Sequence, residues 1–463
     1  MKKTLLTFFV LTIFIFTIQA QSIRYVKQGG AGAADGTSWA NASGSLQAMI
    51  NVTGVTEVWV AAGIYKPTST TNPAIAFHML NGVSILGGFP ATGNPLITDR
   101  DWNTNITILS GDIGTIGDSI DNSYQVIKDS SGYTLNNTAI INGFTIKDGY
   151  SVLQAGYGYG GGMYARHSPT IMNCKFINNT AKFGGGLFCQ SGSAIVTNCD
   201  FSYNRVTGGG GGMFNFGNAT TPIITNCNFS NNKADYGGGM GSENCLPTIT
   251  NCNFFYNTAT TNCGGFYNQN SDAIVTNCNA VYNTAGTQLG VGIYNTNFAF
   301  PVITNCIVWG NSSGSQITGN GTVSYSIVQG GYTGTGNLAT NPLFVDTVNG
   351  DFSLTQCSPA INFGLDSVNN YSTDLAGNPR IYDSIIDIGA YEFQNLFCIT
   401  GLKNIDKTNN SITLKAQPNP FHTIFTVSFE NLEADEYIQL QVFDIAGKEI
   451  YKVTKGGLVL LEL

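Results

Sequence analysis

Short runs of alternating apolar and polar residues recur between residues 160 and 311, and each run includes the dipeptide Asn-Cys. The cysteines follow one another at intervals of 25 to 28 residues. Isoleucine or valine stands three positions before each cysteine, and phenylalanine, alanine or valine stands two positions after it. Alternation over a few residues indicates β-strands rather than helices. Recurrence at a nearly fixed period indicates stacked copies of one small structural unit.

Alignment of the repeats produces three columns of polar or sulfur-containing residues. One asparagine precedes each cysteine, and a second asparagine follows it five positions later. The first asparagine column comprises Asn173, Asn198, Asn226, Asn251, Asn277 and Asn305. The cysteine column comprises Cys174, Cys199, Cys227, Cys252, Cys278 and Cys306. The second asparagine column comprises Asn179, Asn204, Asn232, Asn257, Asn283 and Asn311.

A glycine cluster followed by an apolar residue separates successive Asn-Cys phrases, as in Gly184–Leu187. Glycine permits turns with positive φ and close approach of neighbouring chains. Asparagine tolerates left-handed backbone, and its amide can bond the same residue of the next unit. We therefore predict an all-β fold, a right-handed parallel β-helix with three short strands and three turns per coil. A left-handed helix of hexapeptides would need a period of about 18 residues, which does not fit.

The cysteine column has more than one interpretation. Cysteines stacked on neighbouring coils lie about 4.8 Å apart at Cα. That separation is within the disulfide range, but parallel side chains hold the Cβ atoms farther apart than a disulfide prefers. Buried free thiols, packed as small apolar groups, are the interpretation we favour over disulfides. A metal site is less favoured still, because no compact group of four ligands is evident.

The N-terminal residues have the pattern of a secretory signal peptide. Lys2 and Lys3 precede an apolar run from Leu5 to Ile18, and Ala20 provides a small residue before Gln21. We expect residues 1–20 to be removed on export, with a retained membrane anchor as the alternative. The net charge of −8 argues against nucleic acid as a partner, because phosphate binding needs clustered Lys and Arg.

The phrases "FINN", "FSYN", "FSNN" and "FFYN", each coupled to a cluster such as "GGGM", resemble the repeats of polymorphic outer membrane proteins. That resemblance implies a surface-displayed β-helix with a role in adhesion. Earlier segments, including "SLQAMI" (Ser45 to Ile50), resemble the opening coils of pectin-lyase-like β-helix proteins. There, "SLQAMI" is expected to be a short helix that caps the stack. Residues 21–345 are assigned to the β-helix.

The C-terminal part carries two further resemblances. "DLAGNPRI" (Asp374 to Ile381) and "DIGAYEF" (Asp387 to Phe393) are similar to the terminal module of surface proteins of Bacteroidetes, so residues 346–394 are expected to close the β-helix. A linker, 395–410, comes next. "QPNPF" (Gln417 to Phe421) and "IQLQVFDIAGKEIY" (Ile438 to Tyr451) then make residues 411–463 resemble a type IX secretion sorting domain, a small β-sandwich. This copy lacks the usual basic end, so the domain is expected to be truncated, with periplasmic retention if sorting fails.

Residues suited to catalysis are sparse. Pectin-lyase-like folds include polysaccharide lyases and hydrolases, and a hydrolase needs converging carboxylates. Arg166 beside His167, and Asp99 with Asp101 in "TDRDW", are the weak catalytic candidates. Solvated turn residues and a structural salt bridge, respectively, are the interpretations we favour for them. We expect no metal and no cofactor.

Tyrosines near the glycine clusters are the candidate ligand-binding residues, because rings on one face could stack on sugars. They are Tyr157, Tyr159, Tyr164, Tyr236, Tyr267 and Tyr294. The favoured hypothesis is a monomeric protein, secreted or on the outer cell surface, that binds polysaccharide or host glycan without catalysis. The type IX secretion machinery would be a second partner. A polysaccharide lyase or hydrolase, and a structural stalk, are the alternatives.

Overall fold

The computed structural model describes residues 22–129, 134–152, 158–286, 289–312, 314–382 and 385–394, and five strands between residues 413 and 462. The expected signal peptide and linker lie outside the described residues. In the described part of the chain, no helix has both the length and the apolar character that crossing a membrane requires.

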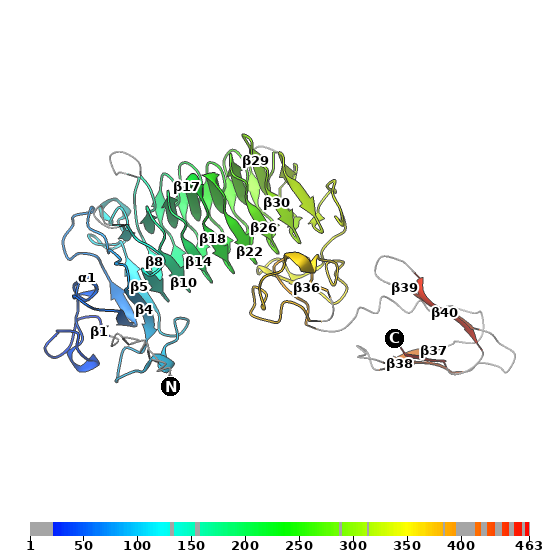
Figure 1. Ribbon diagram of the computed structural model, residues 1–463, viewed down its shortest axis with the longest axis horizontal. Coiled ribbons are helices and arrows are strands. Elements are labelled where there is room, and N and C mark those ends of the chain that lie inside the picture. Colours follow the sequence, from blue (N-terminus) through cyan, green and yellow to red (C-terminus); the bar gives the residue numbers. More distant parts are fainter. Residues whose placement is uncertain are drawn as a thin grey trace, which may run out of the picture.

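Four parallel sheets run along an elongated solenoid, and each regular coil contributes one strand to each sheet (Figure 1). The predicted parallel β-helix is confirmed. The expectation of three strands per coil is wrong for five coils, because the two residues after the second asparagine column also pair between coils. We number the sheets in the order in which a coil meets them.

The first sheet contains β1 (Ile23–Val26), β2 (Glu57–Ala61), β4 (Ser84–Phe89), β7 (Ile140–Asn142), β10 (Thr170–Met172), β14 (Ile195–Thr197), β18 (Ile223–Thr225), β22 (Thr248–Thr250), β26 (Ile274–Thr276), β30 (Val302–Thr304) and β33 (Thr322–Ser324). The second contains β3 (Gly63–Tyr65), β5 (Thr107–Ser110), β8 (Thr145–Lys147), β11 (Lys175–Ile177), β15 (Asp200–Ser202), β19 (Asn228–Ser230), β23 (Asn253–Phe255), β27 (Asn279–Val281), β31 (Ile307–Trp309) and β34 (Ile327–Val328). The third contains β12 (Thr180–Ala181), β16 (Arg205–Val206), β20 (Lys233–Ala234), β24 (Thr258–Ala259) and β28 (Thr284–Ala285). The fourth contains β6 (Ile127–Lys128), β9 (Met163–Ala165), β13 (Leu187–Gln190), β17 (Met213–Thr220), β21 (Met240–Cys245), β25 (Phe266–Gln269), β29 (Ile293–Thr296) and β32 (Ile317–Thr318).

The core of the solenoid is built from columns of identical side chains. Phe176, Phe201, Phe229 and Phe254 stack face to face, with ring centroids 4.7 to 4.8 Å apart. All six cysteines of the cysteine column are buried free thiols, as are Cys189, Cys245 and Cys263. This agrees with the favoured interpretation of free thiols. Cys357, outside the column, is disulfide-bonded.

The second asparagine column forms a continuous buried ladder, which we call the inner ladder. In the middle of it, Asn204 donates from its backbone N and from Nδ2 to Oδ1 of Asn232, both at 3.0 Å. Asn232 does the same to Asn257, and its Nδ2 also donates to the carbonyl of Phe201. Gln316 ends the ladder by accepting from Asn311. Each interior amide therefore has partners for both its donor and its acceptor.

The first asparagine column, which we call the corner column, has a different role. All six of its residues have φ between 51° and 54°, at the bend between the first and second sheets. Only some of the side chains bond their neighbours, such as Asn198 to Asn173 and Asn305 to Asn277. The main role of these residues is thus to form the bend, rather than to bond one another, because asparagine accepts left-handed backbone at low cost.

Glycines in the clusters are required by the close stacking of coils. A Cβ on Gly186 would lie 2.6 Å from the carbonyl oxygen of Gly212 on the next coil and 2.9 Å from the Phe201 ring. In most coils the glycine three positions before the apolar residue, for example Gly184 with φ of 59°, makes the turn, and Cys263 takes this position in one coil. The N-terminal end of the core is covered by α1 (Leu46–Ile50), which buries Leu46, Met49 and Ile50, at the position where the capping helix was expected.

The terminal module, residues 346–394, lies against the side of the later coils (Figure 1). Its apolar residues Phe352, Leu354 and Ile388 pack on Val281 and Ile307 of the second sheet. The module also bonds the corner column, because Asn305 Nδ2 donates to the carbonyl of Leu365 and Asn251 Nδ2 to that of Thr373. A two-stranded antiparallel sheet, β35 (Phe344–Asp346) and β36 (Asp351–Leu354), begins it.

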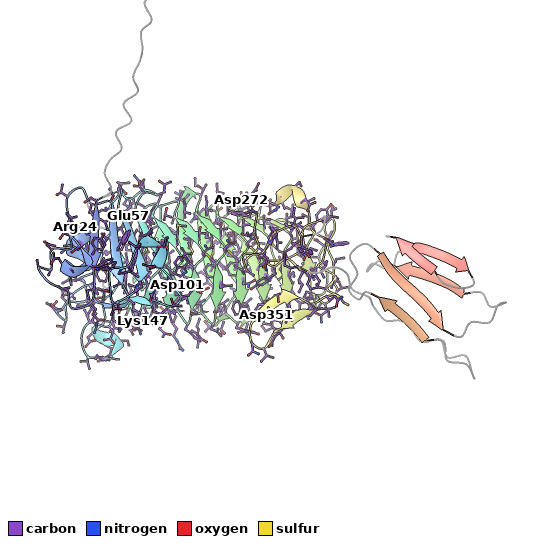
Figure 2. The ribbon with its side chains drawn as sticks, turned by 90° about the horizontal axis from the view of Figure 1, so that it is seen from below. Arg24, Glu57, Asp101, Lys147, Asp272 and Asp351 are labelled. Carbon is purple, nitrogen blue, oxygen red and sulfur yellow. The ribbon has the colours of Figure 1, made fainter. Side chains whose placement is uncertain are left out.

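The C-terminal strands form two small antiparallel sheets. β37 (Thr413–Gln417), β38 (Ile424–Glu430) and β41 (Val459–Glu462) form one, and β39 (Ile438–Phe443) and β40 (Glu449–Lys455) form the other. Four 3₁₀ turns complete the described elements: η1 (Trp39–Asn41), η2 (Ile97–Asp99), η3 (Ser119–Asp121) and η4 (Asp366–Val368). Charged side chains, including Asp101, Lys147 and Asp272, are distributed along the outside of the solenoid (Figure 2).

Candidate functional site

The fourth sheet contains three of the six tyrosines that sequence reasoning singled out, Tyr164, Tyr267 and Tyr294. Strand alternation explains the arrangement, because the residue after each buried Met, Leu, Phe or Ile points outward. The strand register aligns these outward residues on successive coils as one row. The row reads Tyr164, Phe188, Phe214, Gly241, Tyr267 and Tyr294. Tyr157 lies outside the described residues.

Rings from the preceding turns extend this row into what we call the aromatic band. Tyr159 stacks on Phe188 with centroids 4.3 Å apart, and Tyr236 contacts Tyr267 at 4.7 Å. Phe183 lies beside Phe214, at 5.6 Å. Gly209 and Gly241 leave room for these rings, since a Cβ on Gly209 would lie 2.3 Å from the Tyr236 ring. Aromatic contact is thus continuous over several coils.

The rings of the band cover one another to different extents. Phe188 and Phe214 are nearly parallel and only 2% exposed, so their faces meet neighbouring rings rather than solvent. Tyr159, Tyr236 and Tyr294 are half-buried. A ligand on the band would therefore meet ring edges and hydroxyl groups more than open ring faces.

A second outward row, which we call the edge row, runs beside the band. Its members are Arg166, Gln190, Phe216, Glu243, Gln269 and Thr296. At one end, Arg166 is exposed, lies over the ring of Tyr164 at 5.3 Å, and donates from Nε to the Tyr164 hydroxyl at 3.0 Å. The Tyr164 hydroxyl in turn donates to Gln190. These contacts orient planar polar groups along the band.

The middle of the edge row holds its single carboxylate. Tyr267 donates to Oε1 of Gln269 at 2.6 Å, and Gln269 donates to Glu243 at 3.4 Å. Burial raises the pKa of Glu243 above its ordinary value. Burial, together with the nearby carboxylates of Glu243 and Asp235, also raises the pKa of Tyr236, to about 12. The tyrosine therefore stays protonated at neutral pH and keeps its hydroxyl as a donor.

The side chains of Arg166 and His167 contact different partners. Both follow β9 in a turn, where their backbone N–H groups donate to Oδ2 of Asp129, at 2.8 and 3.1 Å. The ring of His167 contacts the same oxygen at 3.1 Å, whereas the guanidinium of Arg166 turns toward Tyr164. Burial raises the pKa of Asp129. The contacts assign His167 and Asp129 to holding this turn.

The Asp99 and Asp101 carboxylates hold turns in the loop between β4 and β5. Oδ2 of Asp99 accepts from the backbone N of Leu96 at 2.8 Å. Asp101 accepts from the backbone N of Asn103, which lowers the pKa of Asp101. The expected salt bridge is not among the ion pairs of the described residues; instead Arg100 donates to Gly87 O and to both oxygens of Asn142.

Sequence reasoning missed the phenylalanines of the band and, apart from Arg166, the edge row. A detectable signal was present, because the first and third residues after each "GGG-apolar" phrase point outward in every coil. In the described part of the chain, no cluster of three or more His, Cys, Asp or Glu side chains is placed to hold a metal ion.

Comparisons with known proteins bear on the solenoid alone. A family model described as "Right handed beta helix region" matches residues 198–330, which covers the most regular coils. A search of curated proteins gave no match. With its parallel sheets and this match, the chain is a right-handed parallel β-helix protein.

Proposed function

We propose that this protein is secreted or attached to the outer cell surface and binds glycans there without catalysis, in an adhesin-like role. The observation that carries the proposal is the aromatic band with the edge row aligned beside it on successive coils. Sugar rings bind proteins through C–H contacts with aromatic groups and through hydroxyls that bond planar polar groups. The two rows offer both kinds of contact along one direction.

The chemistry of the rows favours binding over turnover. Glycoside hydrolysis uses a pair of carboxyl groups about 5 to 9.5 Å apart. Glu243 is the one carboxylate in the edge row, and its neighbours there are Phe216 and Gln269. A long repetitive face also suits a polymeric ligand, since equivalent groups recur on each coil. Export and the sorting role of residues 411–463 belong to this proposal.

A glycan array tests the proposal, followed by affinity measurements with the wild type and with Phe216→Ala and Glu243→Gln. Both residues are partly exposed in the edge row. Ile274→Ala is the matched control, because Ile274 is 50% exposed on the outer side of the first sheet. We expect the edge-row variants to weaken binding roughly tenfold and the control to leave it unchanged.

Three other outcomes would change the conclusion. Release of shortened saccharides from any polysaccharide would make the protein an enzyme. Binding that neither edge-row variant affects would move the site elsewhere on the surface. No binding to any glycan would favour the stalk, which needs no ligand.

A further inference from the structure

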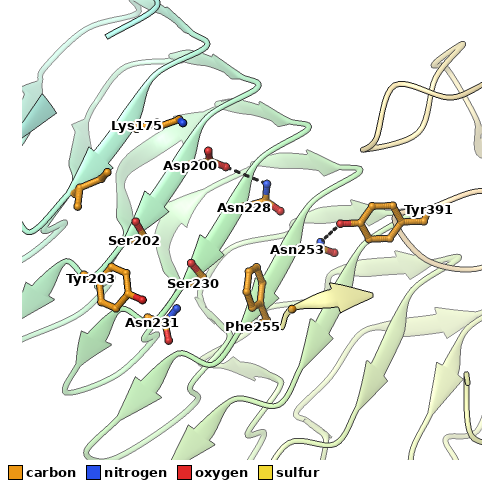
Figure 3. Close-up of a pocket in the computed structure, with 12 residues that line it drawn as sticks. Lys175, Asp200, Ser202, Tyr203, Asn228, Ser230, Asn231, Asn253, Phe255 and Tyr391 are labelled. Carbon is orange, nitrogen blue, oxygen red and sulfur yellow. Dashed lines mark hydrogen bonds between the residues drawn. The ribbon is translucent and has the colours of Figure 1, made fainter. Parts of the chain in front are cut away.

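A groove lies on the outer side of the second sheet, beside the terminal module (Figure 3). The aromatic band belongs to the fourth sheet instead. It has a volume of about 350 Å³, within the range of small-ligand sites. Outward side chains of β11, β15, β19 and β23 line its floor, and Gly350 and Tyr391 of the module line its end. Two segments far apart in the sequence thus build one hollow.

The floor of the groove is a row of polar side chains in strand register. Lys175, Asp200, Asn228 and Asn253 occupy equivalent positions on four successive coils. Asn228 Nδ2 donates to Oδ1 of Asp200 at 3.0 Å, which fixes the carboxylate and leaves its Oδ2 for a ligand. Lys175 makes no ion pair with any described residue. One ammonium and one carboxylate therefore face the groove, and their charges balance.

Tyr203 places an open aromatic ring at the edge of this floor. Its side chain belongs to the turn after β15, and the residue is 54% exposed. Its φ is 57°, and the equivalent positions of other coils, which hold Asn178, Asn231, Tyr256 and Tyr282, have φ between 52° and 56°. The turn is therefore left-handed whichever residue it carries. It holds the ring of Tyr203 outward, where solvent and ligands can reach it.

The module closes the far end of the groove with a hydrogen-bonding group. The Tyr391 hydroxyl accepts from Nδ2 of Asn253 at 2.9 Å. Burial raises the pKa of Tyr391 to about 12, so its hydroxyl keeps a proton that can be donated to a ligand. Phe255 forms the apolar wall beside it and contacts Phe352 of the module with centroids 5.1 Å apart.

We propose that this groove is a second binding site, and that it takes a short uncharged saccharide. The exposed face of Tyr203 would stack on a sugar ring, while Asp200, Asn231 and Tyr391 would bond its hydroxyls. Hydroxyls both donate and accept, which matches a floor of mixed amide, carboxylate and hydroxyl groups. The balanced charge disfavours a polyanion, because Asp200 would repel it while Lys175 attracted it. The site does not depend on the aromatic band.

Titration calorimetry on the full chain tests this site with cellohexaose, xylohexaose, mannohexaose and chitohexaose, and with hexagalacturonate as the acidic comparison. The variants are Tyr203→Ala, Tyr203→Phe and Asp200→Asn. Ile274→Ala on the exposed side of the first sheet is the control, and Phe216→Ala of the edge row reports binding at the other proposed site. We expect at least one neutral hexasaccharide to bind, and Tyr203→Ala and Asp200→Asn each to weaken it about tenfold or more. Tyr203→Phe, which keeps the ring, should stay within about threefold.

The outcomes separate this site from the proposed function. Loss of binding in Phe216→Ala but not in Tyr203→Ala would place the glycan on the edge row and the aromatic band alone. It would overturn the proposal that the groove binds a saccharide. Tighter binding of hexagalacturonate than of the neutral saccharides would overturn the assigned ligand class. Binding of none of the five saccharides would overturn the groove as a saccharide site. Unchanged thermal midpoints of the variants would exclude misfolding as the cause of any loss.

Discussion

The two asparagine columns of the repeat, six residues apart in each coil, differ in how completely their side chains are hydrogen-bonded. Asn232 in the inner ladder uses its donor and its acceptor fully. In the corner column, Oδ1 of Asn226, Oδ1 of Asn251 and Nδ2 of Asn277 are buried without a partner. The inner ladder faces only copies of itself, whereas the later corner residues lie under the terminal module.

The difference shows what repetition achieves in a solenoid. An amide stacked on an identical amide finds a donor for its acceptor and an acceptor for its donor, because the coil spacing repeats. The sequence of the terminal module does not repeat with the coil spacing. Its polar groups are therefore placed to bond only some of the regularly spaced asparagines of the corner column. Thr373 bonds Asn251 and Leu365 bonds Asn305, and other amide atoms between them stay unpaired.

The largest predicted effect comes from breaking the inner ladder with Asn232→Ala. The change removes two bonds that the side chain donates and leaves Asn204 N and Nδ2 without their acceptor. Buried groups without partners are costly, so we expect a loss of roughly 5 kcal/mol in the free energy of unfolding. Urea unfolding followed by circular dichroism measures it. Ser230→Ala, two residues away on the outer side, is the control, and equal losses in both variants would contradict the ladder's role.

A second prediction concerns the charged centre of the module. Arg380 is 1% exposed, donates to the carbonyls of Asp387 and Gly389, and lies 3.8 Å from Glu392. Removing one partner of a buried charge cluster costs about 3 kcal/mol or more. Arg380→Leu should therefore unfold the module while the coils stay folded, since the repeats do not depend on it.

Hydrogen exchange of the Arg380→Leu variant distinguishes unfolding of the terminal module from unfolding of the coils. Amides within the module, such as Leu375 N bonded to Ala390 O, should lose protection, and ladder amides such as Asn204 N should keep it. The exposed Arg205→Leu on β16 is the matched control. Loss of protection in both regions at once would mean that the module and the coils unfold as one unit.

The stacking of the coils could be predicted from the sequence, whereas the groove could not. The columns of phenylalanine, cysteine and asparagine are visible as a period, and each column maps to one position in the coil. The third sheet was missed because the two residues that pair after each ladder asparagine, such as Thr180–Ala181 and Arg205–Val206, are too short a run to read as a strand. The groove depends on Tyr391 meeting Asn253, a contact between segments 138 residues apart that no period encodes.

The aromatic band lies between these extremes. Its tyrosines were found from their closeness to glycine, but their exposure could not be judged, because it depends on which neighbouring rings cover them. The sequence treats Tyr203 as one more residue of an "FxxN" phrase. Only the three-dimensional turn reveals that it is exposed while Tyr164 is covered.

A third prediction uses pH to separate the module from the coils. Burial raises the pKa of Asp387 to about 6 and that of Glu392 to about 8. Among the described residues, Arg380 is the cation that faces these two carboxyls and Asp374. A carboxyl whose pKa is higher in the folded state than in the unfolded state destabilises the folded state when it is ionised. As the pH falls through its folded-state pKa, the carboxyl becomes protonated and this destabilisation disappears. We expect the module to gain on the order of 2 kcal/mol between pH 8.5 and pH 5.5.

Module amide protection, measured by hydrogen exchange and corrected for the intrinsic rate at each pH, reports this gain. Glu392→Gln imitates the protonated acid, so its module should be more stable at pH 8.5 and respond less to pH. Ladder amides are the internal control, because no carboxyl lies in the ladder. A module that loses protection on acidification would contradict the direction of both pKa shifts.

The smallest predicted effect comes from Asn251→Gly, which tests whether a corner-column asparagine matters less for stability than an asparagine of the inner ladder. Asn251 has φ of 51°, a value that glycine adopts freely. The substitution removes one bond, to Thr373 O at 3.0 Å, and also removes a buried oxygen that has no partner. Losing the hydrogen bond destabilises the fold, whereas removing the unpaired oxygen stabilises it. We therefore expect a change within about 1 kcal/mol in the free energy of unfolding. A loss as large as that of Asn232→Ala would show that the corner column is as essential as the ladder, and would remove the distinction between the two columns.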